Sequence, residues 1–284
     1  SCRTGHSCRT GHSCRTGHSC RTGGSGSPRK IFIMPEAISH FFLELYKSDP
    51  KWNFIFFYDP VQMDRVIAGF WTTIELAVVC VLMSVVIGIV GAWMQNQHNR
   101  FLRLLVQGYI QFFRNTPPLI QLMFFYFAMG QFTPTYSPDG WLEIPIISNV
   151  GWAIISLSFF AGAFNVEIFR AGIEAVPEST KEASEALGFS HLQTYRYIIL
   201  PLAFRVSLPS LNNNLVNLVK TTTQAMAIAV PELLYQMVSI YNDYSTAMNA
   251  SMLLLFVVYI GLVAILVLGM SRWEKNSRIP GYGG

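Results

Sequence analysis

The sequence predicts an all-α protein, a polytopic bundle of about five membrane-spanning helices. Hydrophobic residues make up 51% of the 284 residues and charged residues only 13%, which is about half the share in soluble domains. The apolar residues also lie in long runs. The run 66–94 carries one charge, and the run 250–271 carries none. Each run reaches the roughly 20 apolar residues that a helix needs to cross the hydrocarbon core.

Residues 1–33 are interpreted as a low-complexity leader that is disordered or not native. Residues 1–24 read SCRTGH three times and then SCRTGG, and four of the five cysteines lie there. Thiolates and imidazoles suit zinc, so a metal-binding tract is the less favoured alternative. The chain after residue 30 has 14 basic and 16 acidic residues, which does not favour nucleic-acid binding.

The remaining chain divides into three predicted parts. Residues 34–65 mix aromatic and charged side chains and are expected to form an external amphipathic segment, too short and too charged to span. The membrane domain is expected over 66–272, followed by a cytoplasmic tail over 273–284. The predicted spans are 66–94, 105–131, 150–171, 204–230 and 249–271.

The second and fourth predicted spans contain helix breakers and polar groups. Pro117 and Pro118 interrupt the second span, because proline removes a helical hydrogen bond. The fourth contains Pro209 and many amides and hydroxyls, so it is expected to face protein or a wet cavity rather than lipid. The candidate residues for a substrate path are Glu75, Glu167, Asn213, Asn214, Asn217, Lys220, Thr221 and Gln224.

The roles of these candidates stay open at this point. Lys220 contacts a substrate carboxylate or pairs with Glu75 or Glu167, and structural pairing is favoured. Glu167 and Arg170 are three residues apart and are expected to form an intrahelical pair. The amides and hydroxyls either replace water around a zwitterion or form hydrogen bonds between helices.

Loop charges predict the orientation. The loop 95–104 and the segment 170–205 carry basic residues. The loops 132–149 and 231–248 carry acidic residues but no Lys or Arg. Because basic loops favour the cytoplasm, the segment 170–205 and the C-terminus are expected inside, and the N-terminus outside.

The segment 174–201 is expected to form a cytoplasmic helix–glycine–helix unit. Pro177 suits a first helical turn, Gly188 suits a C-terminal stop, and Ser190 suits an N-cap. The segment resembles the EAA–Gly–Ile-x-Leu-Pro pattern of permease subunits of ABC importers, with serine in place of the second alanine. The residues at the pattern's positions are Glu182, Ala183, Ser184, Gly188, Ile198, Leu200 and Pro201, and all except Ser184 match it.

Two further stretches indicate which group of these permeases the chain resembles. Residues 113–121, FRNTPPLIQ, and residues 167–177, EIFRAGIEAVP, are similar to segments of the polar amino-acid permeases. The likeness runs from about residue 66 to 272 and points to the histidine/glutamine/glutamate/arginine/opine group. It implies a type I importer membrane domain in the bacterial inner membrane. The residues that would couple it to an ATPase are Glu182, Ala183, Ser184, Gly188 and Pro201.

The resemblance also implies partners. These are two cytoplasmic ABC ATPases, a periplasmic or extracellular solute-binding protein, and a second copy or a homologous permease. The sequence has no GxxxxGK[ST] phosphate loop, so this chain is not expected to be an enzyme. ATP and magnesium would belong to the ATPase, and no cofactor or metal is expected in this chain.

Three other functions are alternatives for this sequence. A permease for another small solute, such as methionine, phosphonate or an oligopeptide, would share the coupling loop and differ in the two narrower stretches. A gradient-driven transporter should show internal repeats, and none is evident. A membrane enzyme is disfavoured because the sequence has no HExxH or GxSxG motif.

Overall fold

The computed structural model describes residues 34–97, 99–137, 140 and 143–277. The predicted leader, with its repeat and four cysteines, lies outside the described residues. Within them the all-α prediction is confirmed, apart from a small antiparallel hairpin of β1 (Thr135–Tyr136) and β2 (Ile144–Pro145).

Three helices of the described chain are long and apolar enough to cross a membrane. They are α2 (Pro60–Gln95), α5 (Asn149–Glu174) and α10 (Met248–Ser277), and they correspond to the first, third and fifth predicted spans. The side chains of Asp59 and Ser148 cap α2 and α5 by accepting backbone hydrogen bonds.

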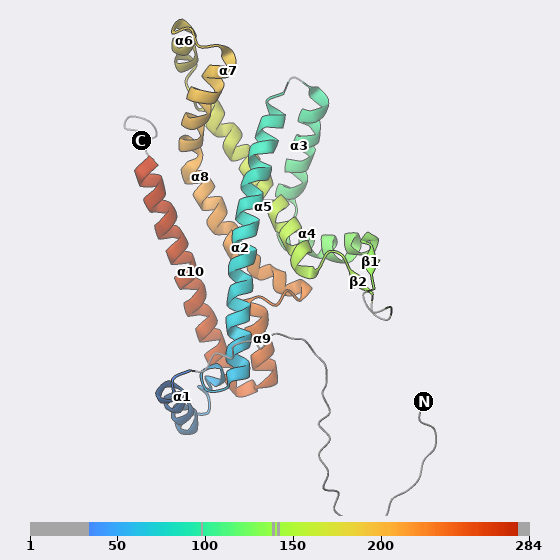
Figure 1. Cartoon of the computed structure of the whole chain (residues 1–284), viewed down its shortest axis with the longest axis vertical. Helices are drawn as coiled ribbons and strands as arrows, with labels where there is room; N and C mark the ends of the chain where they lie inside the picture. The colour runs from blue at the N-terminus through green and yellow to red at the C-terminus, as the bar shows by residue number, and fades with distance from the viewer. Residues whose placement is uncertain (1–33, 98, 138–139, 141–142, 278–284) are drawn as a thin grey trace, which may run out of the picture. The chain divides into compact units, whose positions relative to one another are not determined.

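The second predicted span is interrupted at the prolines, as expected. The helix α3 (Arg100–Asn115) ends before Pro117, and α4 (Pro118–Met123) then leads into a π-helical segment, Phe124–Met129. Past α3 the chain turns sharply aside (Figure 1). The buried Gln121 amide stabilises this turn, because its Nε2 donates to the carbonyl oxygens of Phe113 and Thr116, both at 2.8 Å.

The fourth predicted span, 204–230, is helical almost to its expected end, but it is not one continuous α-helix. The helix α8 (Leu200–Thr221) passes into a 3-10 segment, Thr222–Ile228, which ends at Ala229 with a left-handed φ of 56°. The predicted loop after residue 230 instead contains α9 (Leu233–Asp243), which packs against α2 and α10. The span is therefore discontinuous, with α8 and α9 as its two halves (Figure 1).

Small residues let the long helices approach closely. A Cβ at Gly88 of α2 would meet Asn165 of α5, and a Cβ at Gly172 of α5 would meet Ser207 of α8. The bundle therefore depends on residues without side chains at these crossings, as is usual between membrane helices.

The segment 34–65 packs at the end of the bundle where α2 begins. It contains α1 (Glu36–Ser48) and a 3-10 turn, Ile55–Phe57. Asn53 Nδ2 donates to Thr246 Oγ1 at 2.8 Å, which ties the segment to the start of α10. Burial raises the pKa of the Tyr58 hydroxyl, which donates to Asn53 Oδ1 at 2.5 Å.

Candidate functional site

One face of α8 carries exposed polar side chains, namely Asn213, Asn217 and Lys220, and we call it the polar face. These residues follow one another at i, i+4 and i+7, so they lie on a single side of the helix. In the part of the chain that the structure describes, Lys220 forms no ion pair. The predicted pairing of Lys220 with Glu75 or Glu167 is therefore not observed there.

The depth of the polar face follows from its neighbour Asn212. The Nδ2 atom of Asn212 donates to Glu274 Oε2 at 3.1 Å, close to the C-terminal end of α10. Lys220 lies eight residues further along α8. This spacing places Lys220 about 12 Å deeper, and half of the hydrocarbon core is about 15 Å thick. Lys220 therefore lies alongside the apolar length of α10, away from the C-terminal end of that helix.

Glu167 of α5 pairs with Arg114 of α3, and the Arg114 guanidinium lies 5.2 Å from the centre of the Phe164 ring. The predicted pair of Glu167 with Arg170 is wrong, because Arg170 approaches Glu174 at 3.6 Å instead. Glu167 and Glu174 lie three and four residues from Arg170, so helical spacing allows either to pair with it. Glu167 pairs instead with Arg114 of the neighbouring helix α3.

Glu167 lies on the same side of the bundle as the polar face. It lines a cavity of about 300 Å³ together with Ser210, which is one helical turn from Asn213. Arg114, Glu167 and the polar face thus place a cation, an anion and amides on helices α3, α5 and α8. Such groups can bind a zwitterion, which carries both charges.

The remaining candidates have different surroundings. Asn214 points inward, where its Nδ2 donates to Asn165 Oδ1 at 2.7 Å, and Asn165 donates to Ser84 Oγ at 3.2 Å. This chain of bonds joins α8, α5 and α2. Thr221 is buried, and its hydroxyl donates to the carbonyl oxygen of Asn217. Glu75 is exposed on α2.

Gln224 lies in the 3-10 segment after α8. Its Oε1 atom is buried and has no hydrogen-bond partner among the described residues. A buried amide oxygen without a donor is costly, so it is a position where a substrate, a water molecule or a partner chain can supply one.

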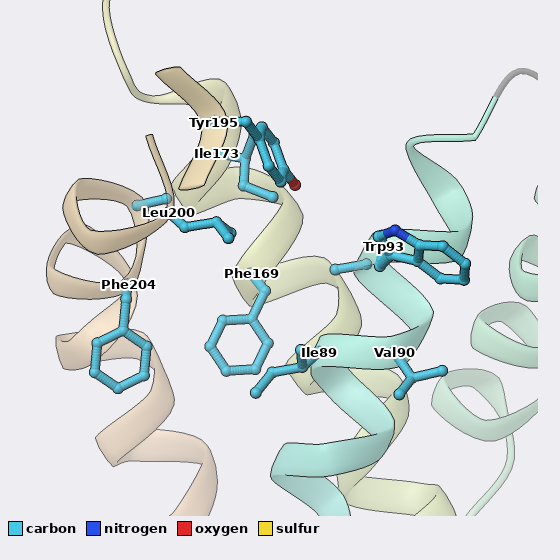
Figure 2. A pocket seen from close by; sticks show the side chains of 10 residues that line it. Ile89, Val90, Trp93, Phe169, Ile173, Tyr195, Leu200 and Phe204 are labelled. Carbon is cyan, nitrogen blue, oxygen red and sulfur yellow. The ribbon is translucent and has the colours of Figure 1, made fainter. Parts of the chain in front are cut away.

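A second cavity, of about 420 Å³, lies on another side of α8. Figure 2 shows its lining, with Trp93 from α2, Phe169 from α5 and Phe204 from α8. Phe204 and Asn213 are nine residues apart, which is about 180° around a helix at 3.6 residues per turn. This apolar cavity therefore faces away from the polar face and does not suit a charged solute.

The predicted helix–glycine–helix unit is confirmed. It consists of α6 (Glu178–Ala186), a turn at Gly188 with a φ of 82°, and α7 (His191–Thr194). Only glycine adopts this conformation without strain. The turn is closed because the backbone N–H of Phe189 donates to the carbonyl oxygen of Ser184 at 3.1 Å. Figure 1 shows α6 and α7 beyond the end of α5.

The residues predicted to couple the chain to an ATPase lie in different surroundings. Glu182 and Ala183 are exposed on α6, Ser184 is buried, and Pro201 is exposed near the start of α8. Two leucines of the same unit were not among the predicted coupling residues. Leu187 and Leu192 are 77% and 75% exposed. Two such apolar side chains on a polar surface are typical of a protein–protein interface. In the sequence, their position within a charged stretch could have indicated this interface.

The family described as binding-protein-dependent transport system inner membrane component matches residues 54–274. The chain belongs to this family. The match includes the polar face, the Glu167–Arg114 pair and the helix–glycine–helix unit. As a member of the family, the chain is a membrane component and not the ATPase of its transport system.

Curated relatives in the family are permeases. The chain is 29% identical over 217 residues to the glutamate/aspartate import permease protein GltJ of Escherichia coli K12, covering 75% of this chain and 87% of GltJ. It is 30% identical over 219 residues to the nopaline transport system permease protein NocM of Agrobacterium fabrum, covering 75% and 88%.

Solved structures have the same fold. A crystal structure of an amino acid ABC transporter with histidines superposes with a TM-score of 0.65 and 26% identity, over 83% of this chain and 98% of that chain. An inward-facing MetNI methionine ABC transporter gives 0.59 at 21% identity, over 78% and 99%. The fold of this chain is therefore that of an ABC importer membrane domain.

Proposed function

We propose that this chain is the membrane-spanning permease subunit of an ATP-driven importer of polar amino acids or opines. The observation that carries the proposal is the exposed Lys220, which forms no ion pair with the described residues and shares a face of α8 with Asn213 and Asn217. A lysine in a span is costly unless it meets an opposite charge or a wet cavity. The α-carboxylate of an amino acid supplies that charge.

The names of the relatives support this substrate class. They are described as import or transport permeases for glutamate/aspartate and for nopaline. These solutes differ in side-chain charge and share a carboxylate on an α-amino acid centre. In this proposal Lys220 binds the shared group, whereas the Glu167–Arg114 pair offers both signs of charge to a variable side chain.

The proposed function also requires partner proteins on both sides of the membrane. The unit of α6 and α7 lies in the cytoplasm, because the segment around it carries basic residues, and Leu187 and Leu192 seat in a cleft of an ABC ATPase. ATP and magnesium are held by that ATPase. The polar face of one chain meets a second permease chain across the path, and a solute-binding protein delivers the substrate from outside.

The test is uptake in vesicles with the reconstituted transporter and a panel of labelled amino acids. Lys220→Met is expected to lower uptake at limiting substrate at least tenfold, since a hydrogen bond to a charged group contributes about 1.5–3 kcal/mol. Lys275→Met is the matched control, because Lys275 is exposed in the last turn of α10. Equal uptake by both variants would remove Lys220 from the path. If wild type transports no amino acid, the substrate class is wrong.

A further inference from the structure

The two arms of the helix–glycine–helix unit are joined by a pair of hydroxyl groups. Ser184 Oγ on α6 lies 2.8 Å from Thr194 Oγ1 on α7, and each residue is only 2% exposed. Ser184 Oγ also donates its single proton to the carbonyl oxygen of Lys181 at 2.7 Å. Thr194 must therefore be the donor in the pair, and Ser184 the acceptor.

The turn at Gly188 between α6 and α7 forms an elbow, and the hydroxyl pair joins its two arms directly. Gly188 has the left-handed conformation and no side chain, so the backbone bonds there shape the turn without tying α6 to α7. A hydrogen bond between side chains ten residues apart in sequence resists opening of the angle between the arms. Opening it would also leave the Thr194 hydroxyl without its acceptor, which is unfavourable for a buried donor.

The second arm continues directly into the substrate-path helix. The helix α7 passes at Thr194 into a π-helical segment, Tyr195–Ile199, and then into α8. Single π-helical turns inside helices often occur at functional sites. Any displacement of α6 reaches the polar face of α8 through this connection, provided that the elbow does not bend.

We propose that Ser184 and Thr194 are positioning residues, which lock the elbow so that α6, α7 and the start of α8 move as one lever. This inference rests on the proposed function, in which an ATPase displaces α6. It also gives a role to the serine that replaces the second alanine of the EAA pattern. An alanine at residue 184 has no hydroxyl and cannot accept the Thr194 proton.

The test compares Ser184→Ala, Thr194→Val and the double variant with wild type in the full transporter in vesicles. Uptake and ATP hydrolysis are measured on the same vesicles, because their ratio does not depend on how much ATPase is bound. Each single variant is expected to lower uptake per ATP at least threefold. The double variant is expected to be no worse than either single variant, since both act on one bond. Thr194→Ser keeps the hydroxyl and is expected to match wild type.

A second measurement does not depend on transport. Spin labels on cysteines introduced at Glu185 of α6 and His191 of α7, both exposed, report the distance between the arms. The distance distribution is expected to broaden in Ser184→Ala and to stay narrow in Thr194→Ser. Equal uptake per ATP or equal distance distributions in wild type and Ser184→Ala would overturn the lever. Multiplicative effects in the double variant would also overturn it.

The two proposals fail in different ways. If wild type binds no ATPase and takes up no amino acid, the proposed function fails and the lever fails with it. If wild type transports and Ser184→Ala transports with the same ratio, the permease function stands and the hydroxyl lever alone is wrong.

Discussion

The Tyr259 hydroxyl donates a hydrogen bond to Glu232 Oε2 at 3.0 Å. Glu232 also caps α9, because its carboxylate accepts from the backbone N–H groups of Leu234 and Tyr235, both at 2.9 Å. Since Tyr259 lies in the middle of α10, the first turn of α9 lies at the same depth. The start of a half-helix and its capping carboxylate are thereby held inside the bundle, next to the break after α8.

Tyr259→Phe should destabilise the protein by about 1–2 kcal/mol, because it removes one hydrogen bond to a carboxylate that is 1% exposed. The measurement is the thermal unfolding midpoint of the protein purified in detergent. Tyr244→Phe is the matched control, since Tyr244 is 38% exposed. Equal midpoints for the two variants would show that the bond does not hold α9.

Gly172→Ala should destabilise the contact between α5 and α8 by about 1–3 kcal/mol, the usual effect of overpacking. A Cβ there would lie 2.7 Å from the carbonyl oxygen of Ala203 as well as against Ser207. Gly269→Ala in α10 is the control, because no atom lies within 4 Å of its added Cβ. That variant should be neutral or more stable, since alanine favours a helix more than glycine does. A Gly172→Ala protein as stable as the control would contradict the close packing.

Arg65 joins the start of α2 to the end of α9, and a charge reversal tests this. Arg65 Nη1 lies 2.8 Å from Asp243 Oδ2 and 2.9 Å from Gln62 Oε1. Arg65→Asp should lower stability and increase proteolysis between α9 and α10. The ion pair is partly exposed, so its own contribution is about 1 kcal/mol or less. Asp243→Arg combined with Arg65→Asp should restore part of the lost stability. If stability is not restored, the ion pair does not hold α9 against α2.

Leu187→Ser and Leu192→Ser should each weaken binding of the ATPase at least tenfold. Fully burying a leucine side chain contributes about 1.5–3 kcal/mol. Binding is measured by co-purification from membranes and by titration of the purified ATPase. Phe132→Ser removes an equally exposed apolar side chain, at 82%, from the segment before β1 and should bind normally. If the leucine variants also bind normally, the ATPase binds another part of the chain.

Local sequence signals were sufficient for much of the fold and for the unit of α6 and α7. Apolar runs identified α2, α5 and α10, because a span needs its own length of apolar residues whatever surrounds it. Pro177, Gly188 and Ser190 predicted the helix–glycine–helix unit, because caps and left-handed turns depend on neighbouring residues only. The same stretch carried the resemblance to the transport family.

The sequence did not determine which side chains pair with each other between helices. Arg170 and Arg114 both carry charges that suit Glu167, and only the packing of α3 against α5 decides that Arg114 is the partner. Asn214 and Asn217 are three residues apart, yet one bonds inward to Asn165 and the other lies on the polar face. Whether a polar residue binds a neighbour or stays available depends on the direction of its side chain, which the fold sets.

The sequence by itself therefore determined the fold class, the family and the shape of the α6–α7 unit, since apolar length, capping and turn chemistry are properties of short segments. The tertiary structure alone decided where the fourth span breaks, which candidates form the polar face, and that Ser184 meets Thr194. Those features arise from contacts between residues on different helices, and a hydrogen bond or ion pair forms only when packing brings its two groups within about 3–4 Å.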